Sequence, residues 1–245
     1  MRRFGIGVVL VVGFIGGTGW PTHARAQGTP DANSAAPFGP PMDDQPIFVH
    51  AQLDQFELRA GDGVGSFRWD GQAWAGTDTN RLVIKSEGFV TAGVTEDGDH
   101  ELLYAHPLSS YFDLQAGVRY DLDALPSRGW AAVGIEGLAP YFFKVAATAY
   151  ASDGGHFAAK VTGSCEELLT QRLILEPQVE LNAYSRPDAA RDVAAGLSDI
   201  DAGVRLRYEV RRKFAPYAGV TYERVLGNAG HTSGVRAAAG FRIWF

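Results

Sequence analysis

The sequence predicts an all-β protein, a transmembrane antiparallel up-and-down β-barrel of about twelve strands that follows a disordered N-terminal arm. Apolar residues occupy every second position in runs of roughly ten to fourteen residues between Ile47 and Phe245. Aromatic residues gather at the ends of these runs, and the last run ends in the aromatic Phe245, as outer-membrane barrels do. These three observations favour strands that cross a membrane.

The first 26 residues predict a signal peptide. Arg2 and Arg3 form a basic start, residues 6–15 an apolar core, and residues 24–26 (Ala-Arg-Ala) a cleavage site. We therefore expect an exported chain whose first mature residue is Gln27. Cleavage would remove three of the 22 basic residues and none of the 28 acidic ones, so the formal charge would fall below the −6 of the whole chain. Such an acidic surface excludes nucleic acid as a partner and suits cations.

Residues 27–46 predict a disordered periplasmic arm. The segment reads QGTPDANSAAPFGPPMDDQP and shows no hydrophobic period that could bury a core. Residues 47–245 then form the barrel as one domain. The single cysteine, Cys165, cannot form an internal disulfide, and we expect it to be an inert thiol.

Alternation is clearest in the last predicted strand, where Val235, Phe241 and Phe245 share one face and charged or small residues occupy the other. A soluble β-sandwich alternates too, with its polar face in water. The runs are nevertheless long enough to cross a bilayer at a tilt, which takes about 9–11 residues. The predicted strands span residues 47–59, 66–77, 80–91, 99–107, 110–122, 128–138, 140–151, 156–168, 171–184, 197–212, 214–226 and 234–245.

The connections between these strands are predicted to alternate in length. Tight turns fall at residues 78–79, 108–109, 139–140, 169–170 and 213, whereas longer loops span 61–65, 92–99, 186–196 and 227–233. Short periplasmic turns, longer outer loops and an even strand number place both termini in the periplasm. The predicted aromatic girdles comprise residues 111–112, 141–143, Phe214 and Tyr217 at one end and Tyr120, Phe157 and Tyr222 at the other.

The polar face of the predicted strands carries charges of both signs, including Lys85, Lys160 and Arg205. The acidic residues that we expect in the lumen are Asp70, Glu87, Asp113, Glu136, Glu180, Asp199, Asp201 and Glu223. A structural interpretation is that opposite charges pair across the barrel and fill it. A functional interpretation is that an acidic subset forms a cation path or binding site. The sequence leaves both open.

The usual catalytic patterns are missing from the sequence, which has no G-x-S-x-G, H-E-x-x-H or C-x-x-C. Barrel enzymes such as outer-membrane phospholipases and proteases use Ser, His and Asp groups at the rim. A rim hydrolase built on His100, His106 or His156 is therefore a weaker alternative, and we predict that the protein is not an enzyme.

Five blocks of the sequence are similar to one known family. They are WDGQAWAGTDTNRLVIKSEG (69–88), YFDLQAGVRYD (111–121), GIEGLAPYFFKVAATAY (134–150), LLTQRLILEPQVELNAYS (168–185) and GLSDIDAGVRLRYEVRRKFAPYAGVTYER (196–224). In this order, and over nearly all of residues 47–245, they resemble the copper resistance protein B family. The resemblance implies an outer-membrane barrel that serves copper tolerance and copper homeostasis beside periplasmic copper-handling proteins.

The candidate copper ligands are few. Members of that family often carry a long arm rich in Met and His, which suit Cu(I) and Cu(II) respectively, whereas the arm here holds one Met and no His. The candidate ligands are Met42, His50, His100, His106, His156 and His231. We expect His100, His156 and His231 at the outer rim and His50 and His106 near the periplasmic side. Carboxylates that could complete a Cu(II) site are Asp97, Asp99 and Glu101 beside His100, and Asp153 beside His156.

The sequence therefore predicts an outer-membrane protein that binds or passes copper ions, with membrane lipid and a periplasmic copper-handling protein as its other partners. The competing interpretation is a passive structural or porin-like barrel without a metal site of its own. The sparse ligand set favours the competing interpretation, and the extent of the resemblance favours the first.

Overall fold

The alternating segments form a continuous antiparallel wall. The computed structural model describes residues 46–61, 65–122, 127–188, 191, 193–227 and 230–245. In this part of the chain the strands are β1 (Phe48–Gly61), β2 (Ser66–Gly76), β3 (Arg81–Thr91), β4 (Val94–Pro107), β5 (Phe112–Asp121), β6 (Arg128–Ala139), β7 (Phe143–Ser152), β8 (His156–Ser164), β9 (Glu167–Leu168), β10 (Leu173–Tyr184), β11 (Gly196–Tyr208), β12 (Phe214–Gly227) and β13 (Gly230–Trp244). Short 3₁₀ turns η1 (Pro140–Phe142) and η2 (Asp153–Gly155) flank β7.

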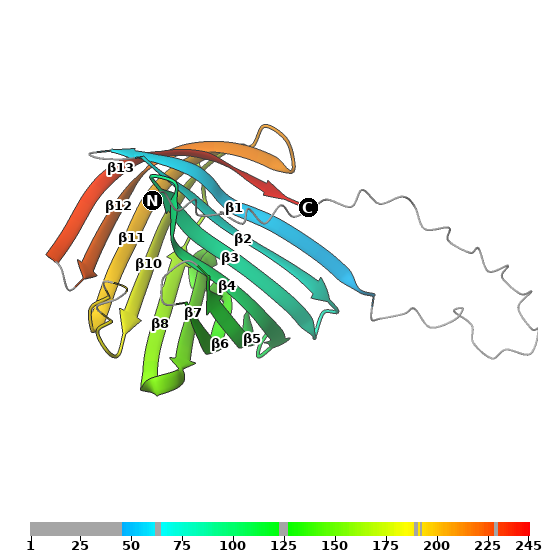
Figure 1. Cartoon of the computed structure of the whole chain (residues 1–245). Helices are drawn as coiled ribbons and strands as arrows, with labels where there is room; N and C mark the ends of the chain where they lie inside the picture. The colour runs from blue at the N-terminus through cyan, green and yellow to red at the C-terminus, as the bar shows by residue number, and fades with distance from the viewer. Residues whose placement is uncertain (1–45, 62–64, 123–126, 189–190, 192, 228–229) are drawn as a thin grey trace, which may run out of the picture. The chain divides into compact units, whose positions relative to one another are not determined.

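Twelve of these strands close into a barrel (Figure 1). Each pairs with its neighbours along the chain in antiparallel fashion, β10 pairs with both β8 and β11, and β13 pairs with β1. The two-residue β9 pairs only with the start of β10. The predicted twelve-stranded antiparallel barrel is therefore confirmed. No helix in the described residues is long and apolar enough to cross a membrane.

The seam between β1 and β13 is hydrogen-bonded to the end of the described chain. The amide of Phe245 donates to the carbonyl of Ala51 at 2.8 Å, and the amide of Ala51 donates to the carbonyl of Phe245 at 3.3 Å. A closed barrel has no edge strand, so its backbone polar groups pair within the wall. This closure allows apolar side chains to face a lipid environment.

Side chains are distributed inside out relative to a water-soluble protein. Val118 and Val133 lie in the middle of their strands and are 56% and 52% exposed, whereas Arg59 and Glu57 are each 1% exposed. Large exposed aromatic side chains lie near the strand ends, among them Tyr111, Tyr141, Phe142, Tyr120 and Phe157. An apolar outer band with aromatic borders and a polar interior is the pattern of transmembrane barrels.

Tyr217 is a correction to the predicted girdles. It is 7% exposed, and its ring lies 6.0 Å from the guanidinium carbon of Arg205, which lines the larger of the two lumen cavities together with Tyr217. Alternation from Phe214 places Tyr217 on the opposite face of β12. Tyr217 therefore faces the lumen, because it lies three positions, an odd number, after the outward-facing Phe214.

A β-bulge in β1 changes which residues face inward. Leu53 pairs with Gly71 and Gln55 pairs with Asp70, so β1 has one residue more than β2 at Asp54. The same extra residue appears in the pairing of β1 with β13. Because side chains alternate along a strand, an inserted residue reverses the facing of all that follow. Glu57 and Arg59 therefore point into the lumen.

Two predicted loops are shorter in the structure. Strand β4 begins at Val94, so the connection from β3 reduces to Ala92 and Gly93, and a bulge opposite Glu87 and Phe89 absorbs one extra residue of β4. Strand β13 begins at Gly230 rather than at residue 234. The polar residues in both segments continue the ladder because hydrogen-bonded strands extend beyond the apolar band.

Candidate functional site: the charged lumen

Two cavities lie among the described side chains inside the barrel. The larger has a volume of about 440 Å³ and the smaller about 100 Å³, and acidic and basic side chains line both. Three charged residues, Glu87, Asp99 and Lys160, line both cavities. We call these three residues the partition, since they separate one cavity from the other.

Lys160 on β8 is the centre of the partition. Its ammonium forms an ion pair with Glu87 on β3 and lies 3.4 Å from a carboxylate oxygen of Glu180 on β10 and 3.6 Å from one of Asp99 on β4. The Lys160 side chain is only 12% exposed. One cation thus meets carboxylates from three strands, two of which lie across the barrel from its own.

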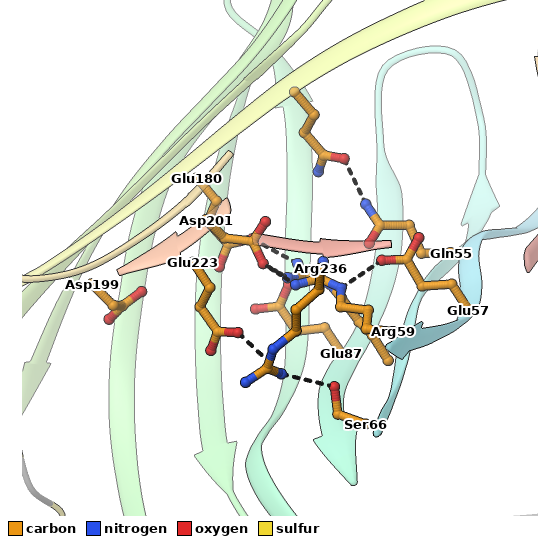
Figure 2. Close-up of polar contacts among 12 residues, drawn as sticks. Gln55, Glu57, Arg59, Ser66, Glu87, Glu180, Asp199, Asp201, Glu223 and Arg236 are labelled. Atoms are coloured by element: carbon orange, nitrogen blue, oxygen red, sulfur yellow. Dashed lines mark hydrogen bonds and ion pairs between the residues drawn. The ribbon is translucent and has the colours of Figure 1, made fainter. Parts of the chain in front are cut away.

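A chain of ion pairs crosses the lumen beside the partition (Figure 2). Arg59 and Arg68 both bind Asp201, at 2.5 and 2.9 Å, and Arg68 also binds Glu180 at 2.7 Å. The two guanidinium carbons lie 5.0 and 4.7 Å from the ring centre of Phe89, a cation–π arrangement. The chain connects β1 and β2 on one side with β10 and β11 on the other.

A second polar group surrounds Asp121, which is 1% exposed. Its carboxylate accepts hydrogen bonds from Arg119 at 2.8 Å, from the indole of Trp130 at 2.9 Å and from Arg191 at 2.7 Å. Arg119 also binds Asp99 of the partition at 2.5 Å. Arg191 belongs to the connection between β10 and β11, and this contact holds the Arg191 side chain against β5.

Three cations hold Glu166, which lies between β8 and β9 at the end of the barrel where β1 begins. We call this the terminal end. Glu166 contacts Lys144 at 2.7 Å and Arg207 and Arg242 at 3.0 Å each. Burial raises the pKa of Glu166, but the hydrogen bond and charge of Lys144, followed by the charge of Arg207, outweigh burial and lower the pKa to about 2. Glu166 is outside the strands and was not among the predicted lumen charges.

The eight predicted lumen carboxylates all have positions on the inner side. Six form ion pairs: Glu87 with Lys160, Asp113 with Arg81, Glu136 with Lys85, Glu180 with Arg68, Asp201 with Arg59, and Glu223 with Arg236. Asp199 accepts a hydrogen bond from Asn182 at 2.8 Å. Figure 2 shows Arg236 between Glu223 and Ser66, whose hydroxyl accepts a bond at 3.1 Å. The lumen is therefore largely charge-paired.

Asp70 differs from the other seven. It lines the larger cavity, and it makes no hydrogen bond or ion pair with any described residue. Of its acidic neighbours, Asp54, the extra residue of the bulge, acts on it more strongly than Glu180. Asp54 itself binds Arg242 at 3.0 Å and accepts a hydrogen bond from Gln52 at 2.7 Å.

The histidines are spread over the barrel rather than gathered. His50 is half-buried near the start of β1, where its Nε2 lies 3.2 Å from the side-chain oxygen of Gln52 and its ring lies 5.9 Å from that of Trp74. His106 is exposed near the end of β4, with Nδ1 at 2.8 Å from the carbonyl of Thr79. His156 begins β8 and is half-buried.

The remaining predicted ligands lie apart from these. His100 is in the interior of β4, not at its end, because that strand is longer than predicted. Asp99 and Glu101 are buried on the inner face of β4, so alternation turns His100 to the outer face. Met42 and the side chains of His231 and Asp97 lie outside the described part of the chain. Within the described residues, no three or more His, Cys, Asp or Glu side chains form a group suited to a metal ion.

Sequence reasoning missed the charges of β1. Glu57 and Arg59 are buried in the lumen, but alternation counted from Leu53 puts them on the wrong face. The signal was in the sequence, since the apolar residues Leu53 and Phe56 are three positions apart whereas the rest of the pattern has a spacing of two. A three-residue step in a strand indicates a bulge.

Comparison with known proteins identifies relatives over most of the chain. A family model described as "Copper resistance protein B precursor (CopB)" matches residues 47–245. The protein named "Copper resistance protein B" from Escherichia coli is 40% identical over 227 residues, which cover 88% of this chain and 77% of that protein. The "Copper resistance protein B homolog" of Pseudomonas syringae pv. tomato (strain ATCC BAA-871 / DC3000) is 36% identical over the same shares.

Two solved structures with the same fold are porins. The NanC porin matches with a TM-score of 0.55 at 13% identity, and the match covers 80% of this chain and 99% of that one. The KdgM porin matches with a TM-score of 0.50 at 12% identity over the same shares. At such low identity the likeness concerns the barrel fold alone.

Proposed function

The chain belongs to the copper resistance protein B family, and on this premise we propose that it serves copper resistance at the outer membrane by binding or passing copper ions. One observation carries the proposal: the family match extends over residues 47–245, which include every strand of the barrel. The relatives' shared name concerns copper, so copper is the cargo that we assign to this barrel.

The chemistry of the lumen supports a cation as the cargo. Carboxylates from at least eight strands line the inner side, and Asp70 lines the larger cavity without an ion pair to any described residue. Carboxylate oxygens and imidazole nitrogens both bind Cu(II). Near His50 the chain offers both kinds of ligand, because hydrogen bonds through Gln52 link the imidazole of His50 to the carboxylate of Asp54, which lines the larger cavity.

For the orientation, we propose that the terminal end faces the periplasm. The connections between β2 and β3 and between β4 and β5 lie at this end and are short, whereas the longest connection between consecutive barrel strands, residues 185–195 between β10 and β11, lies at the opposite end, where outer-membrane barrels have their long outer loops. Residues 1–26 would then direct export, and the segment 27–46 with Met42 would extend toward a periplasmic copper-handling protein. We assign no catalytic role to the barrel.

A passive barrel is the second candidate. The observation that favours it is the chain of ion pairs from Arg59 through Asp201 and Arg68 to Glu180, which spans the lumen from wall to wall. Buried pairs of this kind fill an interior and hold opposite walls together. In that case copper resistance would depend on a partner that supplies the metal site.

Copper binding by the folded protein is the test. The mature chain is folded in detergent, and copper stoichiometry and affinity are measured under reducing and oxidising conditions. Met42, His50, His100, His106, His156 and His231 are replaced one at a time, Met by Leu and His by Gln. We expect one or a few copper ions per chain and a loss of affinity for His50→Gln, with His100→Gln on the outer face as the matched control. If no copper binds to the folded chain under either reducing or oxidising conditions, direct copper handling is rejected and the passive barrel is favoured.

A companion measurement addresses the cell. A strain that lacks the gene is complemented with the wild-type chain or with the His50→Gln variant, and growth is followed over a copper series with zinc as the control metal. We expect the wild-type chain to restore growth in copper only. Equal restoration by a variant that binds no copper would show that resistance needs the barrel but not its ligands.

A further inference from the structure

The partition lies at the one level of the lumen where the two cavities share their lining. Glu87, Asp99 and Lys160 are the charged residues common to both linings. Glu87 and Asp99 pair across the neighbouring strands β3 and β4, whereas Lys160 comes from β8 on another part of the wall. An ion that moved from one cavity to the other would therefore pass these side chains.

Lys160 supplies positive charge where the surroundings are acidic. Its ammonium pairs with Glu87 and lies within 3.6 Å of carboxylate oxygens of Glu180 and Asp99. Asp99 and Glu180 have further cations, Arg119 and Arg68. Among the described residues, Lys160 is the only cation that forms an ion pair with Glu87.

From this geometry we propose that Lys160 closes the barrel to cations by occupying, with its own ammonium, the place between carboxylates that a passing cation would take. The ammonium both fills the space and repels a second cation. Without it, the remaining carboxylates of the partition would attract cations. The inference rests on the proposed function only for the identity of the ion, since any cation in the lumen would meet the same group.

Conductance of single barrels in planar lipid bilayers tests the inference. Wild-type protein, Lys160→Met and Lys144→Met are compared in potassium chloride, and the reversal potential in a salt gradient gives the selectivity. Lys144 is the matched control, because it lines the same larger cavity and is ion-paired, with Glu166, but lies at the terminal end. We expect Lys160→Met to raise conductance at least about tenfold and to favour potassium over chloride, while Lys144→Met stays at the wild-type level.

Two further variants keep the test decisive. Lys160→Arg retains the cation and is expected to stay closed. If Lys160→Met fails to fold, as judged by the heat-dependent gel mobility of folded barrels, the double variant Lys160→Met/Glu87→Gln removes both members of the pair and leaves no new unpaired charge; we expect it to conduct, with weaker cation selectivity.

The opposite results would overturn the inference. One is a wild-type barrel that already conducts as well as Lys160→Met. Another is equal conductance of Lys160→Met and Lys144→Met. A third is that Lys160→Met and Lys160→Met/Glu87→Gln both fold and both remain closed. Copper binding is measured on the same preparations. If Lys160→Met opens the barrel but the protein binds no copper, the proposed function is rejected and the role of Lys160 stands. If the protein binds copper but Lys160→Met does not change conductance, the role of Lys160 is rejected and the proposed function stands.

Discussion

The guanidinium of Arg205 on β11 donates to both carboxylate oxygens of Glu57 on β1, at 2.9 Å each. Strands β12 and β13 lie between β11 and β1 in the wall, so the contact is a chord across the curved sheet. The two side chains are 4% and 0% exposed. This ion pair therefore joins the two sides of the β1–β13 seam from inside the barrel.

Removing Arg205 should destabilise the barrel strongly. Arg205→Gln leaves Glu57 buried with Arg59 as its remaining partner, at 2.8 Å, and loss of one member of a buried pair costs about 3 kcal/mol. Urea unfolding in lipid vesicles, followed by tryptophan fluorescence, measures the change. Arg81→Gln is the control, because its pair with Asp113 is about a quarter exposed and should contribute below about 1 kcal/mol. Equal costs for the two variants would contradict the burial argument.

The double variant Glu57→Gln/Arg205→Gln should lose less stability than the two single variants together. Each single change leaves a charge without one partner, whereas the double change leaves neither. A double-mutant cycle with the same unfolding assay gives a coupling of about 1–3 kcal/mol. Simple additivity would mean that the two side chains act independently despite their contact.

Acid should weaken the cluster at the terminal end through Glu166. The pKa of Glu166 is lowered from 4.5 to about 2 in the folded state, so its ionised form stabilises the fold fully above pH 4.5. That contribution is lost as the pH falls from 4.5 through about 2, where the folded carboxylate takes up its proton. The difference in unfolding free energy between wild type and Glu166→Gln should therefore shrink over this range. Glu167→Gln, an exposed neighbour without an ion pair among the described residues, should show no such trend.

Gly117 should tolerate no side chain. A Cβ atom built at Gly117 would lie 2.0 Å from the carbonyl oxygen of Leu102 and 2.8 Å from the Cα of Leu103, both backbone atoms of the neighbouring strand. Gly117→Ala must therefore push β4 and β5 apart, at a cost of about 1–3 kcal/mol or more. At Gly163 the nearest atom is a side-chain methyl of Val179 at 3.6 Å. Gly163→Ala is thus the matched control, and a similar loss in both would refute the steric explanation.

A charged side chain on the outer face should destabilise the barrel where that face contacts lipid hydrocarbon, and much less at a turn. Val133 lies in the interior of β6 and is 52% exposed, so Val133→Arg would place a guanidinium in the lipid at a cost of about 2–4 kcal/mol. Leu108 is 66% exposed in a turn, and Leu108→Arg should cost at most about 1 kcal/mol. Unfolding in vesicles of defined thickness compares them. Indifference to Val133→Arg would mean that this face does not contact hydrocarbon.

Much of the wall could be predicted from sequence because its strands alternate with few interruptions. From Leu173 to Asn182 on β10, and over the residues of β11 that pair with them, side chains alternate without interruption, so the inward facing of Glu180 and Asp201 can be read directly. It fails at Asp54, where one inserted residue reverses the facing of Glu57 and Arg59. Alternation also gives no partner for a lumen charge: Lys160 meets Glu87 only because the sheet is curved into a ring, and residues that far apart in sequence carry no local signal of contact.

Closure of the wall between β1 and β13 has a consequence for how the protein is made. Strand β1 pairs with β13, the last strand of the barrel, so β1 can form its second strand pairing only after β13 has been synthesised. Until then the chain carries two open strand edges and an apolar face that water cannot accommodate, a combination prone to aggregation. Contacts of such long sequence separation also form slowly. We therefore expect this barrel to depend on holding chaperones before it reaches a bilayer, and assembly of the ring to be a post-translational event.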